Sequence, residues 1–471
     1  MMPMLPRSRW PRTGAPLSVL AAGLLLAGCA VKPAPLSQAE MSQRAKMDRA
    51  ALYAEQEPID GPVTLAGAMA RAVTYNLDHR LEMMKTQLAL GETDVARWSM
   101  LPRVTANAGY TVRNNEAGSN SKSLLDGTES LESSTSVEKQ YETADLTVAW
   151  NVLDFGVSYL DARQQADRQL IAEEQRRKVV NSICRDVRHA YWRTVSAQRL
   201  LPRLEALKDR MDSALRNSRE AQRRGLVPPR KALQYQMSLL ETMRRIVRLR
   251  RDLVSARTEL TSLMNLAPGT DYRVKEPEDG FIVPRVPGDL EDLRRIALVQ
   301  RPELRSARYR DRITALEAEK ELLRLLPGLE LTASSQYSGN EFLYNQNWLE
   351  GGLKLSWNLM RLASAPARME RAEAQEKVSR TRRLSLAAAT LTQVTVAWVQ
   401  YEQAKDDYDL ASELARVARD LEEQAANARS ADAGNGLQAI RRESKAVFAA
   451  MQLPVHRCGG VNRSQQYSTN S

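Results

Sequence analysis

Aromatic residues, cysteine and histidine are scarce in this chain of 471 residues. Aromatic residues make up 5% of it, whereas charged residues make up 27%. A thick globular core needs more large apolar side chains than this, so the composition favours extended helices. The cysteines are Cys29, Cys184 and Cys458, and the histidines are His79, His189 and His456. None of them has the spacing of a metal, redox or catalytic motif, so we expect no cofactor, no metal site and no enzyme activity.

Long hydrophobic runs are also missing. No stretch after residue 30 is long and apolar enough for a transmembrane helix. Any membrane crossing by the mature chain must therefore use strands, because only helices and closed sheets satisfy their backbone groups in lipid. Cys184 lies in a helical pattern, and we expect it to be a small core residue.

The one short apolar run lies near the N-terminus, where Arg7, Arg9 and Arg12 precede "PLSVLAAGLLLAGC". This order is typical of a secretory signal. The stretch 26–29, Leu-Ala-Gly-Cys, also resembles a bacterial lipobox, which implies a signal peptide over residues 1–28 and a lipidated Cys29. Ala30 follows, and by resemblance this favours the outer membrane. A plain signal peptide remains the alternative, and residues 29–60 are expected to form a linker.

The net charge of +11 does not by itself indicate nucleic-acid binding. Arginine residues alternate with glutamate and aspartate along the chain, which is typical of solvated helix faces. We therefore expect no nucleic-acid partner.

The chain contains two copies of one unit. The first copy is assigned to residues 61–284, the second to 285–453, and an atypical polar tail to 454–471. Without gaps, Asn76 in "LAGAMARAVTYNLDHRL" falls on Arg301 in "LEDLRRIALVQRPELRS". In the same register, the Leu-Pro pair at 101–102 falls on the pair at 326–327.

Each copy contains two stretches in which apolar and polar residues alternate, as in strands with one apolar face. The predicted strands are 103–112, 145–153, 328–337 and 352–360, and each copy has a polar loop between its two strands. Tyr110, Trp150, Tyr337 and Trp357 are candidates for interfacial aromatic residues.

Long helices follow the strands, over about 157–223 and 365–430, each about 100 Å long at the rise of an α-helix. Pro202 predicts a kink in the first. Gly225 and Gly434 then mark turns, and a second helix returns from each. The first return helix is expected to stop at Pro268, whereas the second fails near Pro454.

About ten residues is the length of a tilted strand that crosses a bilayer. Four strands cannot close a barrel, and an open sheet edge in lipid is costly. Protomers must therefore pool strands; two would give eight and three would give twelve, with room for a pore.

In these features the chain resembles the TolC-like outer membrane efflux proteins, the outer membrane factor family. The resemblance covers about 60–450 and depends on the repeat, on "NLDHRL" and "RPELRS", on Leu-Pro before each first strand and on "WNVLDFG" at 150–156. It implies a mainly α protomer with a small β part, a homotrimer with a twelve-stranded β-barrel, and an α-barrel of long helical hairpins. The barrel would lie among outer membrane lipids of a Gram-negative bacterium, and the protomer would extend into the periplasm.

The resemblance also implies a passive exit duct for efflux or secretion. Its hairpin tips would meet a periplasmic adaptor protein, which links the duct to an inner membrane pump. The corresponding tip residues are Arg224, Gly225, Leu226, Val227, Gly434 and Asn435. Tight turn geometry explains these glycines equally well.

Three features depart from the family. Lys231 stands near a position that is often acidic, the second copy reads "WNLMRLAS" where the first has "WNVLDFG", and the tail replaces the end of the last helix. Two alternatives therefore stay open, a non-channel periplasmic lipoprotein built from helical hairpins and a defective, truncated efflux protein.

Overall fold

The structure is a computed structural model that describes residues 33–54, 56–130, 132–276 and 286–428. The chain divides into two compact units between Glu57 and Pro58. In the first unit, within the stretch expected to be a linker, helix α2 spans Gln38–Ala51. The Ser37 hydroxyl accepts a hydrogen bond from the Glu40 N–H, and the Glu40 carboxylate accepts one from the Ser37 N–H. This capping box begins the helix, although none of its residues is buried.

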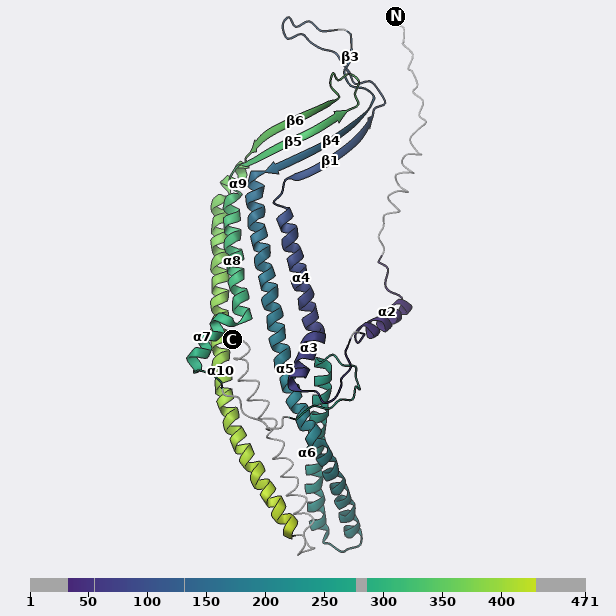
Figure 1. The fold of residues 1–471 in the computed structure, drawn as a ribbon, viewed down its shortest axis with the longest axis vertical. Coiled ribbons are helices and arrows are strands. Elements are labelled where there is room, and N and C mark those ends of the chain that lie inside the picture. The colour runs from purple at the N-terminus through teal and green to yellow at the C-terminus, as the bar shows by residue number, and fades with distance from the viewer. Residues whose placement is uncertain (1–32, 55, 131, 277–285, 429–471) are drawn as a thin grey trace, which may run out of the picture. The chain divides into compact units, whose positions relative to one another are not determined.

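The second unit holds the repeated elements (Figure 1). In the first copy they are α3 (Leu65–Tyr75), α4 (Leu77–Trp98), β1 (Arg103–Val112), β2 (Gly118–Ser119), β3 (Ser134–Thr135), β4 (Gln140–Asn151), α5 (Val152–Arg223) and α6 (Pro229–Leu263). In the second they are α7 (Leu290–Gln300), α8 (Pro302–Leu323), β5 (Gly328–Ser338), β6 (Asn347–Ser356), α9 (Leu359–Ala363) and α10 (Ala365–Ala428). The expectation of a mainly α chain with a small β part is confirmed.

Four strands form one antiparallel sheet in the order β1-β4-β5-β6 (Figure 1). The strand predicted at 145–153 begins earlier, at Gln140, and ends at Asn151. The strand predicted at 352–360 likewise spans Asn347–Ser356. Both predicted strands end too late in the sequence, because the asparagine after each tryptophan is a helix cap. Asn151 accepts hydrogen bonds from the N–H groups of Leu153 and Asp154, and Asn358 accepts one from Arg361.

The long helix α5 continues through Pro202 and pairs with α6 below the middle of the unit. Buried leucines such as Leu204, Leu207 and Leu239 form the core between these two helices. α6 ends at Leu263, earlier than Pro268, because Asn265 adopts a left-handed conformation with φ of 53°. Among the described helices, none combines the length and the apolar character required to cross a bilayer.

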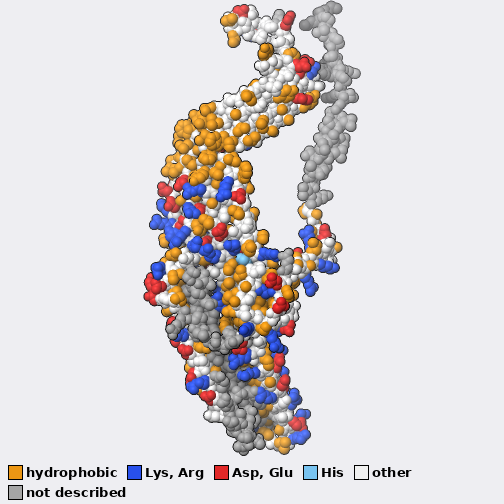
Figure 2. Space-filling model, viewed as in Figure 1, with side chains coloured by type: hydrophobic (Ala, Val, Ile, Leu, Met, Phe, Trp, Pro, Cys, Tyr) orange, Lys and Arg blue, Asp and Glu red, His pale blue; other side chains and the backbone are white. Residues whose placement is uncertain are grey.

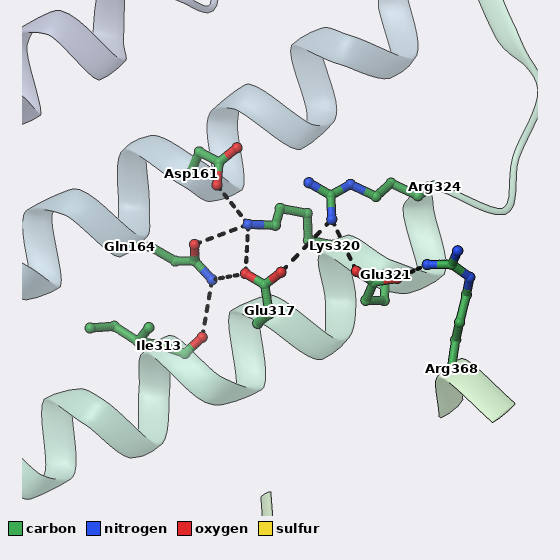
Figure 3. Close-up of polar contacts among 8 residues, drawn as sticks. All are labelled: Asp161, Gln164, Ile313, Glu317, Lys320, Glu321, Arg324 and Arg368. Carbon is green, nitrogen blue, oxygen red and sulfur yellow. Dashed lines mark hydrogen bonds and ion pairs between the residues drawn. The ribbon is translucent and has the colours of Figure 1, made fainter. Parts of the chain in front are cut away.

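A polar interface joins the two copies where α5 packs against α8 (Figure 3). Lys320, with a side chain only 7% exposed, lies 2.7 Å from Asp161 and 2.5 Å from Glu317. Gln164 accepts a hydrogen bond from Lys320 and donates one to Glu317. Further pairs follow along the same helices, Arg312 with Asp167, Arg305 with Glu174 and Lys178 with Glu303. Because these pairs join successive positions of α5 to successive positions of α8, they favour one register of the two antiparallel helices.

Candidate functional site: an exposed apolar sheet face and a hairpin tip

One face of the four-stranded sheet is apolar and yet exposed. The pairing register aligns Val104, Val148 and Ala333 in one row, and Trp150, Leu331 and Leu353 in another. Most of the large apolar side chains in these rows are exposed. The predicted alternation is therefore present in the sheet, and hydrophobic side chains gather over the sheet and its junction with the helices (Figure 2). An exposed apolar surface of this kind marks a contact with lipid or protein.

The opposite face of the sheet is polar. Asn107 donates a hydrogen bond across the strands to Asp145, which also accepts one from Thr147. Glu330 lies opposite Lys354 in the register of β5 and β6. Such cross-strand polar pairs are typical of a face in contact with water.

The four predicted aromatic residues lie at the two ends of the strands. Tyr110 and Tyr337 are near the loops, on the apolar face, whereas Trp150 and Trp357 are near the helices. Trp357 follows β6 directly, and its indole N–H donates to the Leu325 carbonyl at 2.9 Å. Trp150 packs edge-on against Phe155, with the ring centroids 5.8 Å apart. The apolar face thus has aromatic residues near both ends of its strands.

A second exposed apolar surface lies on α4, and sequence reasoning missed it. We call it the α4 stripe; its members are Leu77, Leu81, Met84, Leu88, Val95 and Trp98, and they are between 45% and 74% exposed. The first four are spaced by four, three and four residues, which is the spacing of a coiled-coil seam. The stripe faces away from α5, because the buried residues of α4, Glu82 and Thr93, lie on the other side of the helix.

The helical hairpin tip of the first copy is closed by Gly225. It has a φ of 71°, its N–H donates to the Gln222 carbonyl, and the Leu226 N–H donates to the Ala221 carbonyl. This pattern is the Schellman motif, and it explains the glycine by turn geometry. The tip is basic and apolar: Leu226 is 72% exposed, and Arg224 is also exposed.

Several predicted sites lie outside the described residues. These are Cys29, Gly434 and Asn435, together with the second return helix and the tail. Within the described part of the chain, no group of three or more histidine, cysteine or acidic residues is placed to hold a metal ion. Cys184 is half-buried, so the expectation of a small core residue is wrong.

Comparisons with known proteins agree with this architecture. Residues 81–266 match the family model described as outer membrane efflux protein. The channel CusC is 16% identical and covers 88% of this chain and 95% of its own, with a TM-score of 0.66. The MtrE outer membrane channel of Neisseria gonorrhoeae is 17% identical, with coverages of 86% and 88% and a TM-score of 0.66. The CmeC outer membrane channel of Campylobacter jejuni is 12% identical, with coverages of 94% and 93% and a TM-score of 0.66. A search of curated proteins finds no match.

Proposed function

We propose that this chain, which contains an outer membrane efflux protein domain and has the fold of TolC-like channels, is the protomer of an outer membrane exit duct. The sheet carries the proposal. It has an exposed apolar face, an opposite polar face and aromatic residues at both ends of its strands. Facing lipid on one side and a wet lumen on the other is the simplest use of such a sheet.

We infer that three copies assemble. Within the described residues, β1 and β6 each pair on one side only, and an unpaired strand edge in lipid is costly. Three sheets would give twelve strands and close the barrel without an edge. The α4 stripe fits the same assembly, since it is an uncovered coiled-coil seam.

A surface on α10 complements the α4 stripe. Small residues lie on the side of α10 that faces away from α8: Ala374, Thr381, Ser385 and Ala388. Each of these is exposed, whereas Thr390 and Val394 on the other side of the helix are buried. Leucine and methionine of one copy would pack onto these small residues of the next copy.

The Arg224–Val227 tip is the surface we assign to a periplasmic adaptor, which would connect the duct to an inner membrane pump. An exposed leucine beside arginine residues suits an amphipathic partner surface. We further propose that Cys29 is lipidated and anchors the chain in the outer membrane. The duct would have no catalytic activity, and transport energy would come from the pump.

The sheet also weighs against the alternative of a helical-hairpin lipoprotein. Such a protein needs no sheet with an exposed apolar face, and exposing one would promote aggregation.

The decisive experiment is the mass of the full-length protein extracted from outer membranes in mild detergent. A trimer is expected. The variant Leu88→Glu places a charge in the α4 stripe and is expected to shift the population to monomers, whereas Gln87→Glu, beside the stripe on the same helix, should leave trimers intact. A monomeric wild-type protein would contradict the proposal, and trimers of Leu88→Glu would exclude the stripe as the interface.

A further inference from the structure

A basic cavity lies where α5 and α10 flank the first turn of α8. It has a volume of about 470 Å³. Four cationic residues line it, Lys178, Arg185, Arg188 and Arg301, and Glu303 is the acidic residue among those that line it. The charge of its lining is therefore strongly positive.

Arg188 is the unusual member of this group. Only 5% of the residue is exposed, and its Nε has no hydrogen-bond partner among the described residues. Nor does Arg188 form an ion pair with any residue that the structure describes, although a buried guanidinium without a counter-charge is costly. Burial lowers the pKa of Arg188, as expected for a cation withdrawn from water.

The other three cations are held at the wall of the cavity by partners of their own. Lys178 lies 3.6 Å from Glu303, Arg185 is 2.9 Å from Asp186, and Arg301 donates a hydrogen bond to Gln393 at 2.7 Å. Their charges still raise the potential inside the cavity, while their side chains are fixed in position.

The first turn of α8 adds to this potential. Arg301, at the N-cap position, makes no capping hydrogen bond through its side chain. At the equivalent position in the first copy, Asn76 accepts hydrogen bonds from the N–H groups of Asp78 and His79. An uncapped helix N-terminus points partial positive charge at the cavity and favours an anion there.

We propose that this cavity binds an oxyanion, a phosphate or carboxylate group of a solute, with Arg188 as its principal partner. The guanidinium can donate two parallel hydrogen bonds to such a group. Lys178 and Arg301 would stabilise its charge from the sides, and the Ser182 hydroxyl lies on the same wall. All the residues involved belong to one chain, so the proposal does not depend on the proposed exit duct or on trimer formation.

The test is thermal unfolding of the full-length protein in mild detergent, with phosphate, sulfate or succinate replacing chloride at constant ionic strength. We expect one or more of these anions to raise the melting temperature with a saturating dependence on concentration. A comparison of phosphate with succinate shows whether the cavity binds a phosphate group or a carboxylate group. In Arg188→Met, the affinity should fall by about tenfold or more, because a charge-assisted hydrogen bond is lost.

The control is Arg203→Met, which removes an exposed arginine from the same helix and should leave the anion effect unchanged. Arg188→Met without added anion should be at least as stable as the wild type, since an unpaired buried charge has been removed. As a second measurement, modification of Cys184 by N-ethylmaleimide, located by peptide mapping, should slow when the anion is bound, because Cys184 lines the cavity. The absence of any anion effect in the wild type, or the same effect in Arg188→Met, would overturn the proposal.

Discussion

The two copies of the repeat support their short helices differently. In the first copy, Ala68 and Ala72 of α3 lie in a buried core with Val187, Tyr191 and residues of the segment after α6. In the second, the buried core beneath α7 contains Leu293 and Ala297 of α7 and Val394 of α10. Val187 of α5 and Val394 of α10 occupy matching positions in the repeat, and so do Tyr191 and Trp398.

The difference shows which part of the repeat is kept and which is free to change. The order of helices and strands is common to both copies, because both must deliver two strands to one sheet and a long helix below it. The packing around α3 differs from the packing around α7, and the N-terminal turn of α4 differs from that of α8. Among the described residues, the buried cluster beneath α7 has fewer members than the one around α3, and the basic cavity opens beside it.

The largest effect is expected where the copies meet. Lys320→Ala removes the cation that Asp161 and Glu317 share, and we expect a cost of about 2 to 3 kcal/mol, below that of a fully buried pair, because the two carboxylates are 44% and 35% exposed. Hydrogen exchange of α8 should show that the free energy of opening of this helix is lower by this amount. Lys377→Ala, which removes an exposed pair on α10, should change little. If both variants exchange alike, the polar interface does not hold the two copies together.

The next largest effect compares the two cores directly. Val187→Ala and Val394→Ala remove the same two methyl groups at matched positions that are 0% and 1% exposed. We expect the free energy of unfolding to fall by about 2 kcal/mol for Val187→Ala and by about 1 kcal/mol for Val394→Ala, because more of the described buried side chains surround Val187. Hydrogen exchange of α3 peptides measures the loss in Val187→Ala, and hydrogen exchange of α7 peptides measures the loss in Val394→Ala. Equal losses would mean that the two cores support their helices equally.

Much of this architecture could be predicted from the sequence. Period-two alternation located all four strands, and the gapless register placed Asn76 on Arg301, at the break between two helices in both copies. The strand ends were wrong because Trp150 and Asn151 continue the alternation, while only the structure shows that the Asn151 side chain caps α5. A local sequence pattern does not show whether such an asparagine continues a strand or caps the following helix, because its side chain can be hydrogen-bonded in either role.

The cavity could not be predicted in the same way. Arg188, Arg301 and Gln393 are far apart in the sequence, and each lies in a helix pattern rich in charge. That Arg188 is buried without a counter-ion among the described residues depends on how three helices pack, and composition and periodicity do not show this packing. The α4 stripe, by contrast, has a readable signal in the spacing of Leu77, Leu81, Met84 and Leu88, within the very segment used to find the repeat.

A hydroxyl group in the first core gives the third prediction. The Tyr191 hydroxyl has one hydrogen to donate; its oxygen lies 2.5 Å from the Lys275 carbonyl and 3.1 Å from the Val63 carbonyl. Tyr191→Phe should cost about 1 kcal/mol, since this hydrogen bond is lost from a buried site. Trp398→Phe, at the corresponding position, offers the comparison in the second copy.

The same residue predicts a pH dependence. Burial raises the pKa of Tyr191 to about 12 from an ordinary value of 10.0. Because the folded state holds this proton more tightly, its contribution is complete below pH 10 and is lost as the pH rises toward 12. Melting temperatures between pH 9 and 11.5 should therefore fall more steeply for the wild type than for Tyr191→Phe. Parallel curves would show that Tyr191 does not titrate with unfolding.

The smallest effect concerns the caps of α4 and α8. Asn76 and Arg301 have nearly the same backbone, with φ of −65° and −64° and ψ of 128° in both. Asparagine therefore fits at position 301, where its side chain can accept from the N–H of Glu303 as Asn76 does from that of Asp78. Arg301→Asn should stabilise the first turn of α8 by up to about 1 kcal/mol, and Asn76→Ala should destabilise that of α4 by about as much.

Exchange rates at the first turns of α4 and α8 measure both caps. Arg301→Lys, which keeps the charge without a capping oxygen, is the matched control. Arg301→Asn should also weaken anion binding in the cavity, because it removes a cation and occupies the N–H of Glu303 at the helix terminus. A variant that gains the cap and yet binds the anion as tightly as the wild type would mean that the α8 terminus plays no part in the site. The charge of the cavity would then act through Arg188 and its neighbours on α5.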